Sequence, residues 1–229
     1  MGTGAAVGHE ARSAGALGSP RLFVFVPALE RTRAVEEILS EGLSGIAVTA
    51  FGRFADFSAA IASERPEGAL SLVDTLRVLG IPPGLQAEAG GSAQERYVVL
   101  SKDQSDSLEQ LASKAMGVVD IVGRAELPRL LKGLLGLKAP PVVKRVLKIG
   151  DLLPLLHLEL APAVTLPERF QTEFQKMSRL NLRILRPSTA FLGRAALGFP
   201  TGRVDGAIVY ALHRAPPSVG SLLGAEAWR

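Results

Sequence analysis

Cysteine is absent from this chain of 229 residues, which excludes disulfide bonds, cysteine nucleophiles and thiolate metal sites. Histidine is scarce: His9, His157 and His213 lie far apart in the sequence, and none has a neighbour at metal-ligand spacing. No apolar run approaches the roughly 20 residues that a membrane span needs. Although the net charge is +4, basic runs interleaved with aromatic residues are missing, so we do not predict nucleic-acid binding.

The sequence also lacks the motifs of common catalytic sites. It has no G-x-x-x-x-G-K-[ST] loop and no G-x-S-x-G elbow. Carboxylates follow predicted strands at Glu30, Asp74, Asp120 and Glu168, but no nucleophile, base and orienting group occur together. Glu30 and Glu168 each precede an arginine. Such residues could line a cleft; the alternative is that they cap the following helix or pair with a neighbour. We therefore predict neither catalysis nor a cofactor.

What the chain does contain is a short apolar run followed by a glycine turn and an amphipathic segment. Residues 116–119 end at Asp120, and the turn at residues 121–123 contains Gly123. Leucines then recur at positions 127, 130, 131, 134 and 135, which is the spacing of one helical stripe. The unit reads as strand, turn and helix. In an open α/β sheet such a turn lies at the carboxyl edge, where ligands bind and helix N-termini attract anions.

Similar units are predicted along most of the chain. Strands are expected at residues 22–26, 46–49, 69–72, 97–100, 116–119, 142–146, 163–166, 182–185 and 195–199. Helices are expected at residues 31–41, 53–63, 127–135, 151–158, 167–177, 207–212 and 221–228, with a short capped helix after Ser107. Residues 82–92 are rich in Pro, Gly and small side chains, and we expect a loop there. Alternating strands and helices with short connections predict α/β lobes with mostly parallel sheets.

The first 20 residues differ from the rest. The segment MGTGAAVGHEARSAGALGSP is rich in glycine and alanine and has no apolar h-region, so it is not an intact signal peptide. We expect residues 1–20 to be a disordered lead-in.

Four segments together resemble a known family. RFADFSAAIASERPEGALSLVD, SLEQLASKAMGVVDIVG, DLLPLLHLELAPAVTLPERF and LLGAEAW are similar, in this order, to segments of type II periplasmic solute-binding proteins. The resemblance covers residues 21–229 and is closest to the phosphate/phosphonate-binding branch of ABC-transporter receptors. Oxyanion-binding relatives carry a turn rich in serine and threonine where this chain has Ile121, Val122 and Gly123.

The resemblance implies two α/β lobes, residues 21–101 plus 187–229 and residues 102–186, with a ligand between their strand-end loops. The residues expected to bind the ligand are Ala28, Glu30, Arg31, Arg53, Ser71, Asp74, Asp120, Gly123, Arg124, Glu168 and Arg169. Arg124, near a helix start, is the strongest candidate for holding an anion.

The function implied is that of a substrate-binding component of an ABC transporter. Such a protein would be a periplasmic monomer that closes on a small solute, possesses no enzymatic activity and has an ABC permease as its partner. The alternative is an enzyme built on the same fold, as in some biosynthetic lyases and transferases.

Overall fold

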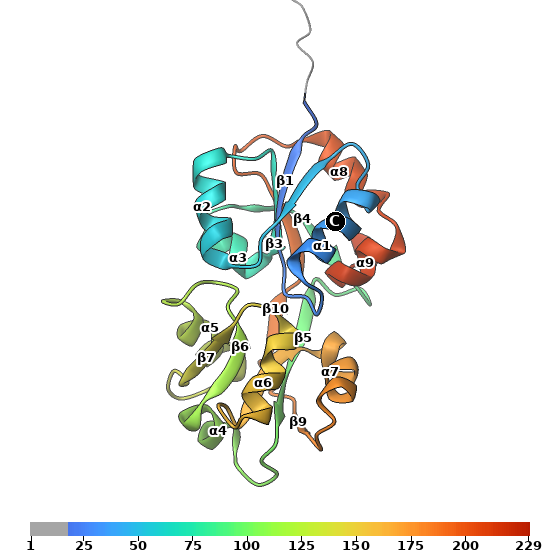
Figure 1. The fold of residues 1–229 in the computed structure, drawn as a ribbon. Helices are drawn as coiled ribbons and strands as arrows, with labels where there is room; N and C mark the ends of the chain where they lie inside the picture. The colour runs from blue at the N-terminus through green and yellow to red at the C-terminus, as the bar shows by residue number, and fades with distance from the viewer. Residues whose placement is uncertain (1–17) are drawn as a thin grey trace, which may run out of the picture.

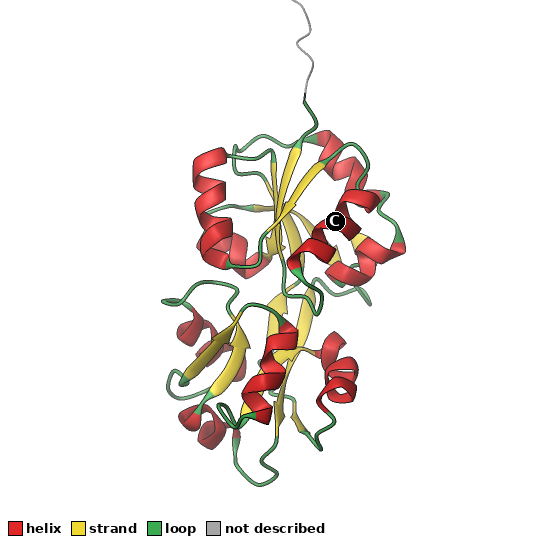
Figure 2. Cartoon of the chain, in the orientation of Figure 1, coloured by secondary structure: helices red, strands yellow, loops and turns green. Residues whose placement is uncertain are grey.

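The computed structural model describes residues 18–229, so residues 1–17 of the expected lead-in lie outside the described part. Figures 1 and 2 show two lobes, one above the other, each with a central sheet flanked by helices. Two separate six-stranded sheets form the centres of the lobes. The predicted α/β class with two lobes is confirmed.

The first sheet has the strand order β12-β4-β11-β3-β1-β2. Its strands are β1 (Arg21–Phe25), β2 (Ala47–Ala50), β3 (Gly68–Leu72), β4 (Pro83–Glu88), β11 (Ala195–Gly198) and β12 (Ala227–Trp228). Strand β1 pairs in parallel with β2 and β3, whereas β11 is antiparallel to β3 and β4. Strand β12 is antiparallel to β4.

Helices cover both faces of this sheet because alternate residues of β1 point to opposite faces and nearly all are buried. Phe23 and Phe25 belong to the core beneath α2 (Phe54–Glu64) and α3 (Val73–Val78). Leu22 and Val24 belong to a second core. The helices over that core are α1 (Thr32–Gly42), α8 (Gly206–His213) and α9 (Pro217–Leu223).

The second sheet has the order β10-β5-β8-β6-β7, with β9 also paired to β5. Its strands are β5 (Gln94–Ser101), β6 (Met116–Val119), β7 (Val143–Val146), β8 (Ala163–Pro167), β9 (Arg183–Leu185) and β10 (Phe191–Gly193). The helices are α4 (Leu108–Lys114), α5 (Leu127–Leu135), α6 (Leu152–His157) and α7 (Gln171–Ser178), with 3₁₀ turns η1 (Ile149–Asp151) and η2 (Glu168–Phe170). Strands β6, β7 and β8 are parallel, and β5 runs against its three neighbours.

The chain crosses between the lobes twice. It leaves the first sheet after β4 and enters the second through β5, and it returns from β10 to β11 through the single residue Arg194. Both β5 and β10 belong to the second sheet: Gln94 of β5 pairs with Gly193 of β10, and the residues from Tyr97 on pair with β8. The division of the chain into lobes at residues 101 and 187 stays a prediction.

Three segments differ from the sequence prediction. Residues 82–92 contain β4, whose antiparallel pairing with β11 stabilises a segment that reads as a loop. Residues 73–78 form α3 where no helix was expected. The closing helix ends at Leu223, because Gly224 adopts a left-handed conformation (φ 65°), and Trp228 instead pairs with β4 in β12.

Two side chains at helices of the second lobe lie in environments that the sequence does not indicate. Asp151 makes no capping hydrogen bond, because it has helical dihedral angles and ends a 3₁₀ turn. Met177 is 47% exposed, whereas Phe170 and Phe174 on the same segment are buried.

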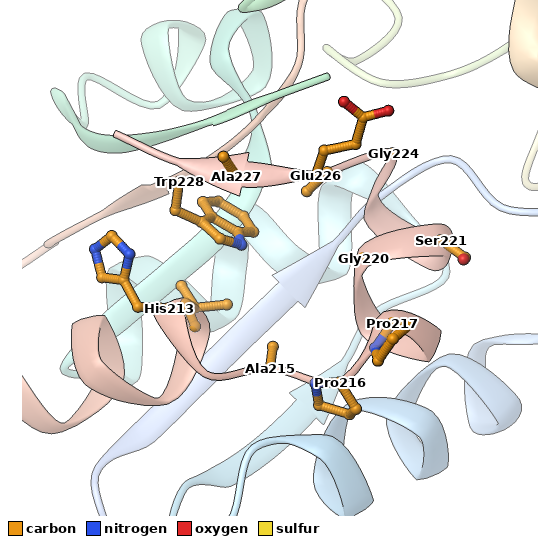
Figure 3. A pocket seen from close by; sticks show the side chains of 12 residues that line it. His213, Ala215, Pro216, Pro217, Gly220, Ser221, Gly224, Glu226, Ala227 and Trp228 are labelled. Atoms are coloured by element: carbon orange, nitrogen blue, oxygen red, sulfur yellow. The ribbon is translucent and has the colours of Figure 1, made fainter. Parts of the chain in front are cut away.

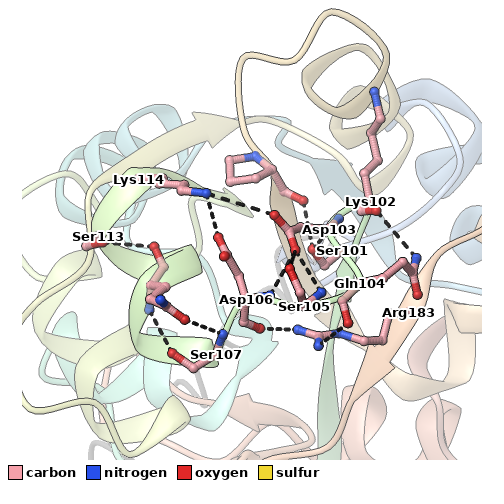
Figure 4. A network of polar contacts seen from close by, with 12 residues as sticks. Ser101, Lys102, Asp103, Gln104, Ser105, Asp106, Ser107, Ser113, Lys114 and Arg183 are labelled. Carbon is pink, nitrogen blue, oxygen red and sulfur yellow. Dashed lines mark hydrogen bonds and ion pairs between the residues drawn. The ribbon is translucent and has the colours of Figure 1, made fainter.

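A polar network closes the far end of the second lobe (Figure 4). The Asp103 carboxylate accepts hydrogen bonds from the backbone N–H groups of Ser105 (2.9 Å) and Asp106 (2.8 Å), which hold its pKa at about 2. Arg183 of β9 donates to the carbonyl of Gln104 (2.7 Å). This loop leads into α4, where the predicted capping box of Ser107 and Gln110 is confirmed.

None of the helices within residues 18–229 has the length and apolar character needed to cross a membrane.

The capping box gives a test of the local energetics. We expect Ser107→Ala to lower the free energy of unfolding by about 1 kcal/mol, because the N–H of Gln110 loses its acceptor. Ser113→Ala on the same helix should change it by less than about 0.5 kcal/mol, because Ser113 is exposed and alanine favours helix. Urea unfolding followed by circular dichroism measures both, and equal effects would contradict the assignment.

Candidate functional site

The segments that follow the carboxyl ends of β1, β3, β6 and β7 meet between the lobes. Two hydrogen bonds join them directly: the Thr75 hydroxyl donates to the Ile121 carbonyl (2.8 Å), and the Ile149 N–H donates to the Ala28 carbonyl (3.0 Å). The first is fully buried, although its two residues come from different sheets. The strand-end loops of the two lobes are therefore in contact across one shared crevice.

A third contact in this crevice involves the turn after β6. Gly123 has φ +85°, and a Cβ built on it would lie 2.9 Å from the Phe54 ring at the start of α2. This turn therefore requires glycine for two reasons, the left-handed backbone and the close approach of the opposite lobe.

Three of the expected ligand residues in the first lobe are engaged within the protein. Ala28 is buried with its carbonyl hydrogen-bonded to Ile149. Ser71 is buried and donates its hydroxyl to the Phe25 carbonyl. The Asp74 carboxylate accepts from the N–H of Gly193 (3.3 Å) and pairs with Arg77.

The remaining three of the first lobe lie at the outside of the crevice. The side chains of Glu30, Arg31 and Arg53 are exposed. They form no hydrogen bond or ion pair with other side chains in the described part of the chain. The structure therefore does not bring these charges together into one binding site.

In the second lobe the two expected carboxylates are paired. Asp120 accepts from the N–H of Gly123 (2.7 Å) and from the Arg145 guanidinium (2.8 Å), so it shapes the turn that Gly123 completes. Glu168 accepts from Arg186 at 2.7 Å. The expectation that such a carboxylate pairs with a neighbour fits Glu168, although the partner is not the adjacent arginine.

The two arginines of the second lobe differ in environment. Arg124 is exposed and lies three residues before α5 begins at Leu127. Arg169 lies over the Phe170 ring, 4.3 Å from its centroid, and donates to the buried carboxylate of Glu95. Because Glu95 also lies 3.9 Å from Arg194, it joins η2 to both crossing segments. Of the two, Arg124 alone is exposed to a solute from outside.

A small cavity of about 10 Å³ lies in the crevice, which is room for one water molecule at most. Pro27 of the first lobe closes it against the second lobe. The other lining residues are Tyr97, Val118, Val119, Ile121, Leu127, Leu130, Leu131, Leu134, Thr165, Pro167 and Leu192.

Sequence reasoning missed Tyr97 and Thr75 as site residues. The Tyr97 hydroxyl is buried without a hydrogen-bond partner among the described residues, and burial raises the pKa of the phenol, so it remains protonated. A polar side chain inside an apolar strand such as YVVL was the available signal. Its significance depended on knowing that β5 passes behind the crevice.

A larger hollow of about 750 Å³ lies elsewhere, on the first lobe (Figure 3). His213, Pro216, Ser221, Glu226 and Trp228 are among the residues that line it. None of the strand-end loops that meet in the crevice contributes to its lining. In residues 18–229, no cluster of three or more His, Asp or Glu side chains is arranged to hold a metal ion.

Gly123 can be tested with a matched pair of substitutions. Gly123→Ala should lower the free energy of unfolding by about 1–3 kcal/mol, because alanine is strained in the left-handed region and meets Phe54. Gly133→Ala on α5 meets no atom within 4 Å and should raise stability by up to about 1 kcal/mol. Thermal and urea unfolding measure the stability of both variants. A change of the same sign in the two free energies of unfolding would refute the requirement for glycine at position 123.

The Glu95 cluster provides a second test. Glu95→Ala should cost about 3 kcal/mol, because it leaves the partly buried Arg169 and Arg194 guanidinium groups without their carboxylate. The control is Glu37→Ala on α1, which removes an exposed ion pair with Arg33 and should cost less than about 1 kcal/mol. A Glu95→Ala variant as stable as the control would show that the cluster does not hold the crossing segments together.

No protein-family model matches the chain, and no curated protein matches its sequence. Solved structures do match its fold. A binding protein component of an ABC phosphonate transporter from Pseudomonas aeruginosa is similar over 92% of this chain and 81% of its own, with TM-score 0.62 and 12% identity. The periplasmic VFT2 domain of BvgS from Bordetella pertussis covers 90% of this chain and 93% of its own, with TM-score 0.56 and 15% identity.

A third similar structure is that of Tv2483 bound to L-arginine. It has a TM-score of 0.60 and 12% identity, and the match covers 91% of this chain and 92% of that one. The chain therefore has the two-lobed α/β fold of the type II periplasmic binding proteins.

Proposed function

We propose that this chain is a solute-binding module whose two lobes close on a small ligand in the crevice between them. One observation carries the proposal: strand-end loops from two separate sheets converge on a single crevice. In open α/β sheets, ligands bind outside the carboxyl ends of the strands. In this chain the carboxyl ends of strands from two sheets face one crevice, so both lobes can contact the same ligand.

The connections between the lobes suit opening and closing. Besides the contacts across the crevice, the lobes are joined by the segments β4–β5 and β10–β11. Hinged domains close by changes at a few residues of such connections, while each lobe stays intact. A ligand that touches both lobes then favours the closed arrangement over the open one.

Transport is the proposed setting. We propose the role of the substrate-binding component of an ABC transporter, acting as a periplasmic monomer that delivers its solute to a permease. The similarity to a phosphonate transporter component and to the periplasmic VFT2 domain of BvgS supports this. The solute itself does not follow from these similarities, because one related structure belongs to a phosphonate transporter and another holds L-arginine.

We propose binding rather than catalysis. The threonine hydroxyls near the crevice donate to backbone carbonyls: in the described chain Thr165 donates to the Val98 carbonyl (3.1 Å), and Thr75 donates to the Ile121 carbonyl. The carboxylates of Asp74 and Asp120 are held by backbone N–H groups and arginines. These groups form no set of nucleophile, base and orienting residue.

Lobe closure can be measured directly, because the chain has no cysteine of its own. The variant Ser63→Cys/Ser113→Cys places one dye on α2 and one on α4, at exposed positions in different lobes. We expect a solute that binds to change energy transfer between these dyes and to raise the melting temperature. A ligand at 100 times its dissociation constant adds about 2.7 kcal/mol of stability. The panel is phosphate, phosphonates, sulfonates, amino acids, polyamines and small neutral compounds.

The control variant is Ser40→Cys/Ser63→Cys, with both dyes on helices of the first lobe. Its energy transfer should stay constant when the solute is added. If no solute of the panel changes either the melting temperature or the distance between the lobes, the binding function is wrong. Conversion of a bound solute into product by the wild-type chain would favour the enzyme alternative.

A further inference from the structure

The wall of the crevice cavity is almost entirely apolar. Helix α5 contributes four leucines, β6 contributes two valines, and Pro27 closes the cavity from the first lobe. Thr165 and Tyr97 are the lining residues with polar side chains, and the Thr165 hydroxyl is used by the Val98 carbonyl. The apolar wall favours a ligand with apolar surface to bury.

The charged groups around the cavity are already neutralised. Asp120 is paired with Arg145, Asp74 with Arg77, and Arg169 with Glu95. The exposed arginines Arg31, Arg53 and Arg124 are not among the residues that line the cavity. A charged ligand group enclosed here would lose its hydration without gaining a partner of opposite charge, which is strongly unfavourable.

One hydrogen-bonding group of the wall is unused. The Tyr97 hydroxyl has no partner in the described structure, although the residue is 95% buried (5% exposed). Buried hydroxyls without partners are rare, because they cost free energy that a hydrogen bond would recover. The other buried side-chain atoms in residues 18–229 without a partner are the Nε atoms of Arg169 and Arg183, and neither residue lines the cavity.

We propose that the crevice binds a small neutral, largely apolar molecule with one polar group that hydrogen-bonds to the Tyr97 hydroxyl. This inference rests on the proposed solute-binding function, since it assigns the ligand class of the same crevice. It replaces the anion expected from the sequence. The reason is that the arginines which suggested an anion lie outside the cavity or, as with Arg169, are already paired with a carboxylate.

The ligand enters only when the lobes part. The cavity of about 10 Å³ is far smaller than a ring such as benzene, which needs an apolar cavity of about 150 Å³. Opening separates Pro27 from α5 and breaks the hydrogen bond between Thr75 and Ile121. The ligand then takes the place of direct contacts between the lobes.

Four probes with one ring and different polar groups test the ligand class: toluene, benzyl alcohol, benzoate and benzylamine. Calorimetry on the full chain should rank benzyl alcohol first, toluene about threefold to tenfold weaker, and the two ions weaker still. Tyr97→Phe should reduce the affinity for benzyl alcohol to that for toluene and leave toluene unchanged. The melting temperature without ligand should stay the same or rise, because the substitution removes an unpartnered hydroxyl.

The matched control is Tyr210→Phe, which alters the chain's other tyrosine, 61% exposed on α8, and should change no affinity. Tightest binding of benzoate or benzylamine would overturn the ligand class while leaving the solute-binding function intact. Unchanged benzyl alcohol affinity in Tyr97→Phe would overturn the role of the hydroxyl. If none of the four probes binds but phosphate or an amino acid closes the lobes, the inference is wrong and the proposed function stands.

Discussion

The pairing of β5 with its three neighbours is the interaction on which the rest of the structure depends. Its first half, from Gln94 to Arg96, pairs with the returning strand β10, and its second half pairs with β8 and β9. The outgoing and returning segments thus form an antiparallel ribbon between the lobes. Arg194 strengthens this ribbon, since its guanidinium donates to the carbonyls of Ser92 (3.0 Å) and Gly224 (2.9 Å). The two segments that connect the lobes are therefore held to each other by this ribbon.

The same strand supplies two residues of the site. Glu95 and Tyr97 are two positions apart on β5 and lie on the same face of the sheet. Glu95 holds Arg169 and Arg194, and Tyr97, whose hydroxyl is unpartnered among the described residues, lines the cavity. Strand β5 thus contains both the carboxylate that pairs with Arg169 and Arg194 and the tyrosine whose hydroxyl has no partner among the described residues. Neither residue can change its position without disturbing the crossing ribbon.

The contacts across the crevice combine apolar packing with hydrogen bonds, since one buried core cluster contains residues of both lobes. A typical intramolecular hydrogen bond contributes about 0.5–1.5 kcal/mol net, and two such bonds join the strand-end loops, from Thr75 to Ile121 and from Ile149 to Ala28. The contact of Phe54 with Gly123 adds a small apolar area. Differential binding worth a few kcal/mol is enough to change the populations of open and closed forms.

Much of the fold follows from the sequence alone. The buried strands β1, β3, β6 and β8 are short apolar runs, and the stripe of α5 is visible in the leucine spacing. The glycine turn at Gly123 and the capping box at Ser107 were also predictable, because backbone turns and caps depend on neighbouring residues. The approach of Phe54 to Gly123 was not, because Phe54 belongs to the other lobe. Strands β4 and β12 were not, because their stability comes from partners far away in the chain.

The same distinction between local and long-range interactions applies to the site. The sequence alone determined which loops follow the strands, and so it identified Asp120, Gly123 and their neighbours as residues at the carboxyl edges of the sheets. It did not determine which charges remain unpaired, because Glu95 lies 74 positions from Arg169 and Arg145 lies 25 positions from Asp120. Only the tertiary structure decided this, since ion pairs and burial depend on distances in space. For the same reason Tyr97, an ordinary strand residue in the sequence, became the unpartnered group of the crevice once two lobes enclosed it.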